Sequence, residues 1–305
     1  MAMRYDELCT QVTATIVDTI ESGQAGAWRA PWHHNGTPGL FSPTNASTGK
    51  SYAGANIVLL AVEALAEDYS NHTWATYKQW QQLGAQVQRG EHGTRCVKWI
   101  AKTTEAAEHS SNGGTLQRTI LIPRVFTVFN IAQVDGYQPP ASEPHDTPDP
   151  ITAAEAFIAA TGALIDYGWN GAKYRPLIDR IQVPGIDQYR NAEDHYATVL
   201  HELVHWTGHP SRLHREFGQR FGDDAYAAEE LVAELGAAFA TARLGIANTP
   251  RPDHAAYLSH WLRILKADPK ALFLTAAKAQ AAVDHLMRVQ RVTAALFGEV
   301  PPVGA

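Results

Sequence analysis

The sequence lacks the features of a secreted, membrane or nucleic-acid-coating protein. Its 305 residues contain two cysteines, Cys9 and Cys96, in no pairing pattern, so we expect free thiols in a reducing compartment. No apolar run approaches the roughly 20 residues that span a bilayer, and Arg4, Asp6 and Glu7 stand where a signal peptide begins, with no apolar core after them. The net charge of −6 argues against coating of nucleic acid by bulk charge. We therefore predict a cytoplasmic globular protein in which any contact with nucleic acid comes from a local patch.

A chain of this length is long for a single core, so two domains are expected. The clearest boundary is a proline-rich, acidic stretch over residues 139–150, which predicts a stiff, solvated linker. It divides the chain into a front half, residues 1–138, and a rear half, residues 151–305. The predicted fold class is α+β, with an α+β front half and a mostly helical rear half that contains a small sheet.

Hydrophobic periodicity and β-branched residues predict the elements of both halves. In the front half we expect helices over residues 5–20, 56–66 and 73–83, and strands over 85–88, 95–103 and 119–129. In the rear half we expect a helix from residue 151, a strand over 180–183, and helices from near Asn191 to near Gly208 and over 226–244, 255–266 and 269–290. Asn191 can cap its helix, because Asp194 follows three residues later.

The segment Val199–His205 carries the strongest chemical signal in the chain. It places His201 and His205 four residues apart, and positions i and i+4 of a helix lie on the same face, so both rings can reach one metal ion. Glu202 follows the first histidine, about 100° around the helix. In this HExxH spacing the carboxylate acts as a general base on the attacking water. The segment therefore predicts a metallohydrolase site with Glu202 as its catalytic residue.

A catalytic metal site needs a third protein ligand, and three extensions of the motif could supply it. One protease family places a glycine seven residues and a third histidine ten residues after the first. Gly208 fits that pattern, but Ser211 stands where the histidine belongs. His209 is a weak candidate, because it lies only one turn past His205 at the end of the helix. The third ligand is therefore expected from a later helix.

The predicted helix over residues 226–244 supplies carboxylates among small and apolar residues. We predict Glu230 as the third metal ligand and Glu234 as the acceptor of a hydrogen bond from a ligand histidine. Glu229 is the rival ligand, because neighbouring positions cannot be separated from sequence. Small residues such as Ala233 and Gly236 would let this helix approach the histidine helix closely. The predicted cofactor is one divalent metal, Zn²⁺ in the first place, with Mn²⁺ as the alternative.

The alternative interpretation of the motif is a buried helix with two core histidines. It requires hydrogen-bond partners for both imidazoles and gives no role to Glu202.

Several longer motifs resemble those of ArdC-type antirestriction proteins. They are His201–His209, Ser211–Leu213, Glu229–Leu235, Asp179–Pro184 and Tyr196–Leu200 in the rear half, and Pro43–Asn45, Thr48–Lys50, Tyr52–Asn56, Trp74–Trp80 and Val128–Asn130 in the front half. The resemblance covers nearly the full chain. It implies a plasmid-borne protein that protects incoming DNA from restriction, with a front single-stranded-DNA-binding domain and a rear zincin-like metallopeptidase domain.

The front half also has residues suited to single-stranded DNA. Five of the eight tryptophans precede the linker, and residues 71–102 carry five cations against Glu91 alone. Aromatic side chains that stack on bases and cations that follow phosphates hold single strands without sequence readout. The predicted DNA contacts are Trp28, Trp32, Lys50, Tyr52, Trp74, Lys78, Arg89, Arg95 and Lys98. The alternative for Trp74 and Trp80, spaced along a predicted helix, is burial in the core.

Three classes of function fit these features. In the first, a peptidase cleaves a protein substrate such as a restriction component or another host protein, with an extended substrate paired to the strand over 180–183 and His195, Tyr226 or His209 as an oxyanion donor. In the second, the front half shields single-stranded DNA and the metal site is structural or vestigial. In the third, the metal serves phosphodiester hydrolysis, which is disfavoured because nucleases prefer carboxylate-rich Mg²⁺ sites or paired metals.

Overall fold

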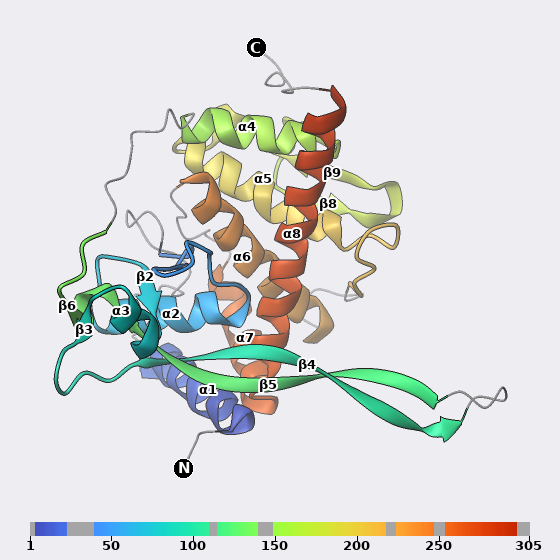
Figure 1. The fold of residues 1–305 in the computed structure, drawn as a ribbon. Helices are drawn as coiled ribbons and strands as arrows, with labels where there is room; N and C mark the ends of the chain where they lie inside the picture. Colours follow the sequence, from blue (N-terminus) through green and yellow to red (C-terminus); the bar gives the residue numbers. More distant parts are fainter. Residues whose placement is uncertain are drawn as a thin grey trace.

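The computed structural model describes residues 4–22, 40–109, 115–139, 149–217, 224–246 and 254–297. The front half contains α1 (Tyr5–Ser22), β1 (Thr44–Asn45), α2 (Ala55–Ala66), β2 (Thr73–Ala75), α3 (Tyr77–Gln82), β3 (Gln86–Val87), β4 (Thr94–His109), β5 (Thr115–Asn130), a 3₁₀ turn (Ile131–Gln133) and β6 (Val134–Asp135). Four strands form one sheet in the order β1-β2-β5-β4, and β3 pairs with β6. The paired strands β4 and β5 are long and extend beyond the body of the molecule as a hairpin (Figure 1).

The rear half is a bundle of helices with a small sheet. Its elements are α4 (Pro150–Ala160), β7 (Leu164–Tyr167), β8 (Lys173–Arg175), β9 (Arg180–Val183), α5 (Ala192–Thr207), α6 (Asp224–Leu244), α7 (His254–Ala267) and α8 (Ala271–Phe297), with 3₁₀ turns at Pro176–Ile178 and Ile186–Gln188. The sheet order is β7-β9-β8, with β7 parallel and β8 antiparallel to β9. Helix α8 crosses the molecule from one end to the other beside α5 and α6 (Figure 1). The α+β class expected from the sequence is confirmed.

Most of the expected elements are present, and the expected position of one helix is wrong. The helix expected over 73–83 begins only at Tyr77, because Thr76 caps it through a capping box with Gln79. Residues Thr73–Ala75 instead form β2, which pairs with β1 on one side and β5 on the other. In the rear half, Asn191 caps α5 as expected, since its side chain accepts a hydrogen bond from the Asp194 amide.

The larger of two hydrophobic clusters among the described residues runs through both halves, and the smaller one, around Trp80, lies within the front half. One cluster of buried side chains contains Leu8 and Ile57 from the front half together with Leu235 and Leu272 from the rear half. Hydrogen bonds also join the halves, including one of 3.0 Å from the Gly54 amide to Gln280 Oε1. The front half therefore packs directly on the rear bundle, with α1 against α7 and α2 against α8. Across the described residues, every helix is too short or too polar for a bilayer-spanning segment.

Candidate metal centre

Helices α5 and α6 pack in close contact and bring the candidate site together. The contact depends on Gly236, because a Cβ atom at that position would lie 2.7 Å from Val204 Cγ2 on α5. That separation is shorter than any ordinary carbon contact, so only glycine fits here. The close approach expected from the small residues of α6 is therefore present. It carries the carboxylates of α6 to the histidine face of α5.

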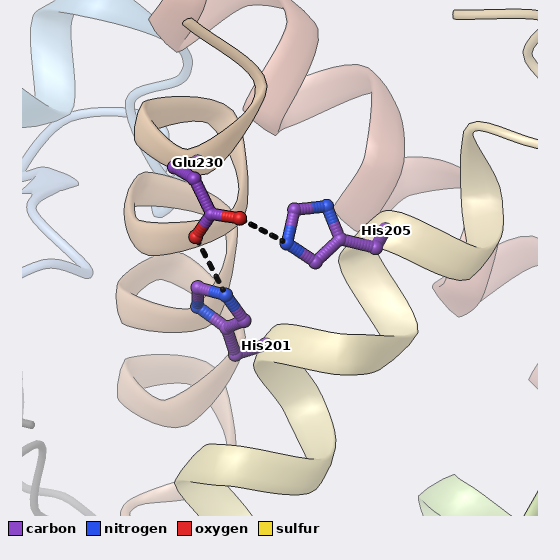
Figure 2. Close-up of side chains that lie close together, drawn as sticks. All are labelled: His201, His205 and Glu230. Carbon is purple, nitrogen blue, oxygen red and sulfur yellow. Dashed lines mark ion pairs between the residues drawn. The ribbon is translucent and has the colours of Figure 1, made fainter. Parts of the chain in front are cut away.

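Two histidines and one glutamate form a compact cluster in this interface (Figure 2). His201 Nε2 lies 3.5 Å from Glu230 Oε2, and His205 Nε2 lies 3.5 Å from Glu230 Oε1. One donor atom from each of the three residues lies within 4.8 Å of the other two, and all three side chains are buried. Two imidazole nitrogens and a carboxylate oxygen are a donor set that binds Zn²⁺ and other first-row divalent ions. The cluster therefore has the chemistry and the size of a three-ligand metal site.

The other ring nitrogen of each histidine faces a second carboxylate. His201 Nδ1 lies 3.1 Å from Glu234 Oε1, and His205 Nδ1 lies 3.2 Å from Glu229 Oε1. In metal sites, a carboxylate at Nδ1 fixes the ring orientation and leaves Nε2 as the metal donor. Both rings thus present Nε2 to the same point in front of Glu230. Glu229, the rival ligand, lies on the opposite side of the His205 ring from that point.

Arg215 fixes the position of Glu229, and no sequence pattern points to it. Its guanidinium donates to both carboxylate oxygens of Glu229, and the shorter of these contacts is 2.8 Å. It also donates to Thr207 Oγ1 and to the Val204 carbonyl at the end of α5. The side chain of Arg215 is 7% exposed. Loss of either partner of this buried ion pair would be costly, because it would leave an uncompensated buried charge. Loss of Arg215 would also remove the donor to the Val204 carbonyl at the end of α5. His205, Glu229 and Arg215 therefore form one continuous chain of hydrogen bonds.

Both carboxyls around His205 are held in the ionised form. Burial acts to raise the pKa of Glu230, but the charges of His205 and His201 and hydrogen bonds from His201 and Tyr226 outweigh it and lower the pKa to about 2. Burial likewise acts to raise the pKa of Glu229, and hydrogen bonds from His205 and Arg215 lower it below its usual range. An ionised Glu230 is the form that binds a cation.

The remaining rear-half candidates lie in different surroundings. Glu202 is 3% exposed on α5, directly after His201. Tyr226 hydrogen-bonds Glu230 and is therefore part of the cluster's surroundings. His209 is engaged at the end of α5, where its Nδ1 lies 2.8 Å from Ser211 Oγ. His195 lies in a separate cavity near the start of α5.

The expected pairing of a substrate with residues 180–183 is wrong. These residues form β9, the central strand of the small sheet, and both of its edges are already hydrogen-bonded to β7 and β8. A central strand has no unpaired backbone groups to offer. The turn before β9 is instead tied to the segment after α5, because Arg212 forms an ion pair with Asp179 and donates to the Trp206 carbonyl.

The predicted DNA contacts divide into four groups. Trp74 is completely buried, in edge contact with the Tyr69 ring, so its assignment as a stacking residue is wrong. Tyr52 is half-buried, and its hydroxyl accepts a hydrogen bond from Asn45 and donates to the Trp74 carbonyl. Trp28 and Trp32 lie outside the described residues. Lys50, Lys78, Arg89, Arg95 and Lys98 are all exposed.

One face of the β4–β5 hairpin carries aligned cations. Lys98 pairs directly across the strands with Arg124, so the two side chains share a face, and Lys102 lies further along it. All three are exposed. From the Thr94–Val128 pair to the Thr104–Arg118 pair, the paired residues on this face include no acidic one. Like charges placed directly opposite destabilise a strand pair, and a polyanion relieves that repulsion.

Comparison with known proteins shows the family of both halves. Residues 152–279 match the family model described as a zincin-like metallopeptidase, so the rear half has a zincin-like domain around the HExxH helix. Residues 6–129 match the N-terminal domain of the anti-restriction factor ArdC. The crystal structure of the metal-free antirestriction ArdC protein from plasmid R388 superposes with a TM-score of 0.75 at 37% identity, over 94% of this chain and 98% of that one. The chain therefore belongs to the ArdC family of antirestriction proteins.

Other relatives extend the comparison. The Mn(II)-bound structure of the R388 protein superposes with a TM-score of 0.73 at 35% identity, over 93% of this chain and 98% of that one. An uncharacterised protein of Sinorhizobium fredii, y4eC, is 41% identical over 92% of this chain and 91% of its own length. A DNA primase of Escherichia coli, TraC, is 39% identical over 92% of this chain, which spans only 27% of that protein.

Proposed function

We propose that this protein protects DNA from restriction by binding it as a single strand through the front half, residues 1–138, and that the rear half, residues 151–305, is a metal-dependent peptidase. The observation that carries the peptidase proposal is the pair of histidines whose Nε2 atoms converge on Glu230 while their Nδ1 atoms face Glu234 and Glu229. Two histidines with a purely structural role in the core would not require three buried carboxylates around their rings.

The donor set fits a divalent cation. His201, His205 and Glu230 would hold the ion, Glu234 and Glu229 would orient the two rings, and Arg215 would keep Glu229 in place. When bound, the ion would polarise a scissile carbonyl and lower the pKa of a water molecule. Zn²⁺ suits two imidazoles and one carboxylate, and the Mn(II)-bound relative supports Mn²⁺ as an alternative.

In this mechanism Glu202 performs the proton transfers. Its carboxylate takes a proton from the attacking water and later delivers it to the leaving amine. Tyr226, which hydrogen-bonds Glu230, would be the donor to the developing negative charge. The proposed substrate is a protein, such as a restriction component or another host protein.

The exposed cations support single-stranded DNA as the second partner. Lys98, Lys102 and Arg124 line one face of a hairpin that extends from the body (Figure 1), and like charges opposed across strands are relieved by phosphates. The buried free thiols of Cys9 and Cys96 support the reducing cytoplasm as the location.

Restriction protection in cells tests the link between the two activities. We expect Glu202→Gln to retain metal and DNA binding and to lose cleavage of a general protein substrate by at least about 100-fold. Protection that disappears in this variant assigns antirestriction to proteolysis. Protection that persists at the wild-type level assigns it to shielding of single-stranded DNA. Full cleavage by a metal-loaded Glu202→Gln protein contradicts the peptidase proposal.

A further inference from the structure

The rear half contains a cavity whose lining shares no residue with the metal cluster. Its volume is about 600 Å³, and its walls come from α4, the end of β7, residues 185–187 and the start of α5. On α5 the cavity is lined by His195, six residues before His201, which places it about 9 Å further along the helix axis. Much of the wall is aliphatic, with Ile158, Ile165 and Ile186 among its members.

A buried histidine lines this cavity without a full set of partners. His195 is 4% exposed, and its Nδ1 has no hydrogen-bond partner within the described part of the chain. The ring is enclosed by Tyr167, Tyr189 and Tyr196, with centroids at 6.0, 5.0 and 5.0 Å. Burial lowers its pKa, so the imidazole is neutral and one ring nitrogen can accept a hydrogen bond. Buried polar atoms in native proteins are normally satisfied, which points to a missing partner for Nδ1. With the ring proton on Nε2, that partner is a hydrogen-bond donor.

The charged groups of the same cavity are both acidic. Glu155 Oε1 accepts a hydrogen bond of 2.5 Å from the Tyr196 hydroxyl, which holds the carboxylate at the wall. Asp187 folds over Gly185, where a Cβ atom would lie 2.5 Å from its Oδ1. Neither carboxylate forms an ion pair with a lysine or arginine of the described residues. The cavity therefore offers two carboxylates, an imidazole acceptor and an aromatic wall from Tyr167 around an apolar interior.

We infer that this cavity binds an alkylammonium or guanidinium group carried on an apolar stem. The cation would donate hydrogen bonds to Glu155 and to His195 Nδ1 and lie against the Tyr167 ring, while the stem covers the isoleucines. The same chemistry is found in a free aliphatic amine and in a lysine or arginine side chain of a peptide. The inference is independent of the metal site and of DNA binding.

Calorimetry on the full chain, with a chelator present, tests the inference. The probes are n-butylammonium, n-butylguanidinium, the neutral n-butanol and a short peptide with one central lysine. We expect saturable binding of one cation per chain and at least tenfold weaker binding of butanol. Tighter binding of the peptide than of butylammonium identifies a basic side chain as the natural occupant, and equal or weaker binding identifies a free amine.

Matched variants locate the binding. Glu155→Gln keeps an acceptor for Tyr196 but removes the charge, and His195→Gln removes the imidazole; each is expected to weaken butylammonium binding at least tenfold. Glu193→Gln removes the same charge from the first turn of α5 outside the cavity and should change binding less than twofold. In NMR spectra, the histidine signal that is missing in His195→Gln should shift with butylammonium. Absence of saturable binding, equal affinity for butanol, or full binding by both cavity variants overturns the inference.

Discussion

Each histidine of the candidate metal centre has a carboxylate near both of its ring nitrogens. The carboxylate at Nδ1 determines that Nε2 faces Glu230. His201 Nδ1 faces Glu234 and His205 Nδ1 faces Glu229, so neither ring can turn its Nδ1 toward Glu230 without leaving a buried partner. A fixed ring removes the conformational cost of bringing Nε2 to an ion. We therefore expect the metal affinity of this cluster to depend also on residues that would not touch the metal.

Arg215 is the residue that tests this dependence. We expect Arg215→Ala to leave Glu229 charged and unpaired in a buried position, which destabilises the protein by about 3–5 kcal/mol, and to weaken Zn²⁺ binding by about 10–100-fold. Unfolding by denaturant and competition with a metal-binding dye measure the two effects. The control is Arg190→Ala, because the Arg190 side chain is 76% exposed and forms a surface ion pair with Asp194 near the start of α5. Wild-type metal affinity in Arg215→Ala would remove the proposed role of Glu229.

The sequence predicts the residues of the centre better than it predicts their supports. His201 and His205 follow from helical spacing, and the HExxH pattern predicts Glu202 as the base. A third ligand from the pair Glu229 and Glu230 follows from a carboxylate helix with small residues. Arg215 lies in an irregular segment eight residues after Thr207, and no periodic pattern connects it to Glu229. The separate roles of Glu229 and Glu230 come from the rotation of α6 against α5, which tertiary packing sets.

At the scale of elements, the contact between α5 and α6 determines whether a centre exists. Gly236 meets Val204 where the helices approach, and Glu230 lies about 1.7 turns before Gly236 on α6. A displacement of α6 by even one methyl group would move the carboxylate away from the imidazole rings.

A methyl group at Gly236 should therefore damage stability and metal binding together. We expect Gly236→Ala to cost about 1–3 kcal/mol of unfolding free energy through overpacking and to weaken metal binding measurably. Because the clash is with Val204, the double variant Val204→Ala/Gly236→Ala should recover part of both losses, giving a coupling energy above about 0.5 kcal/mol. Strictly additive losses in the double variant would show that the clash is not the cause.

Local patterns fail where tertiary pairing overrides them. Aromatic residues at 74, 77 and 80 have helical spacing, yet Trp74 forms part of a strand because β1 and β5 supply partners on both sides. The β-branched residues of β4 and β5 predict these long strands in the right places, since their signal is local. The central position of β9 depends on two pairings, and neither can be read from the strand itself.

At the scale of the whole molecule, the two halves bury apolar side chains against each other in one shared core, so each half contributes to the stability of the other. Leu8 and Ile57 are buried in the same cluster as Leu235 and Leu272, so a front half cut at residue 138 would expose apolar surface that the full chain covers. Experiments on DNA binding are therefore best made on the full chain, in which this surface is buried.

Binding of single-stranded DNA is expected to depend on the hairpin cations. Affinity of the full chain for an oligothymidylate, measured by fluorescence anisotropy, should fall steeply as salt rises. Lys98→Gln with Arg124→Gln should lower the slope of log K against log salt by about 0.7 for each phosphate that the protein no longer neutralises. Lys173→Gln with Arg175→Gln removes two exposed charges from β8 in the rear half and serves as the control. A slope that changes equally in both double variants would exclude a specific role for the hairpin.

The central claim is that α5 and α6 together bind one divalent ion through His201, His205 and Glu230. The direct measurement is anomalous X-ray scattering at the zinc edge from crystals grown with Zn²⁺, paired with elemental analysis of dialysed protein. We expect one peak within bonding distance of both Nε2 atoms and a Glu230 oxygen, one ion per chain, and loss of that ion in His201→Ala and in Glu230→Ala. An empty cluster at saturating Zn²⁺, or an ion retained in full by both variants, would contradict the claim.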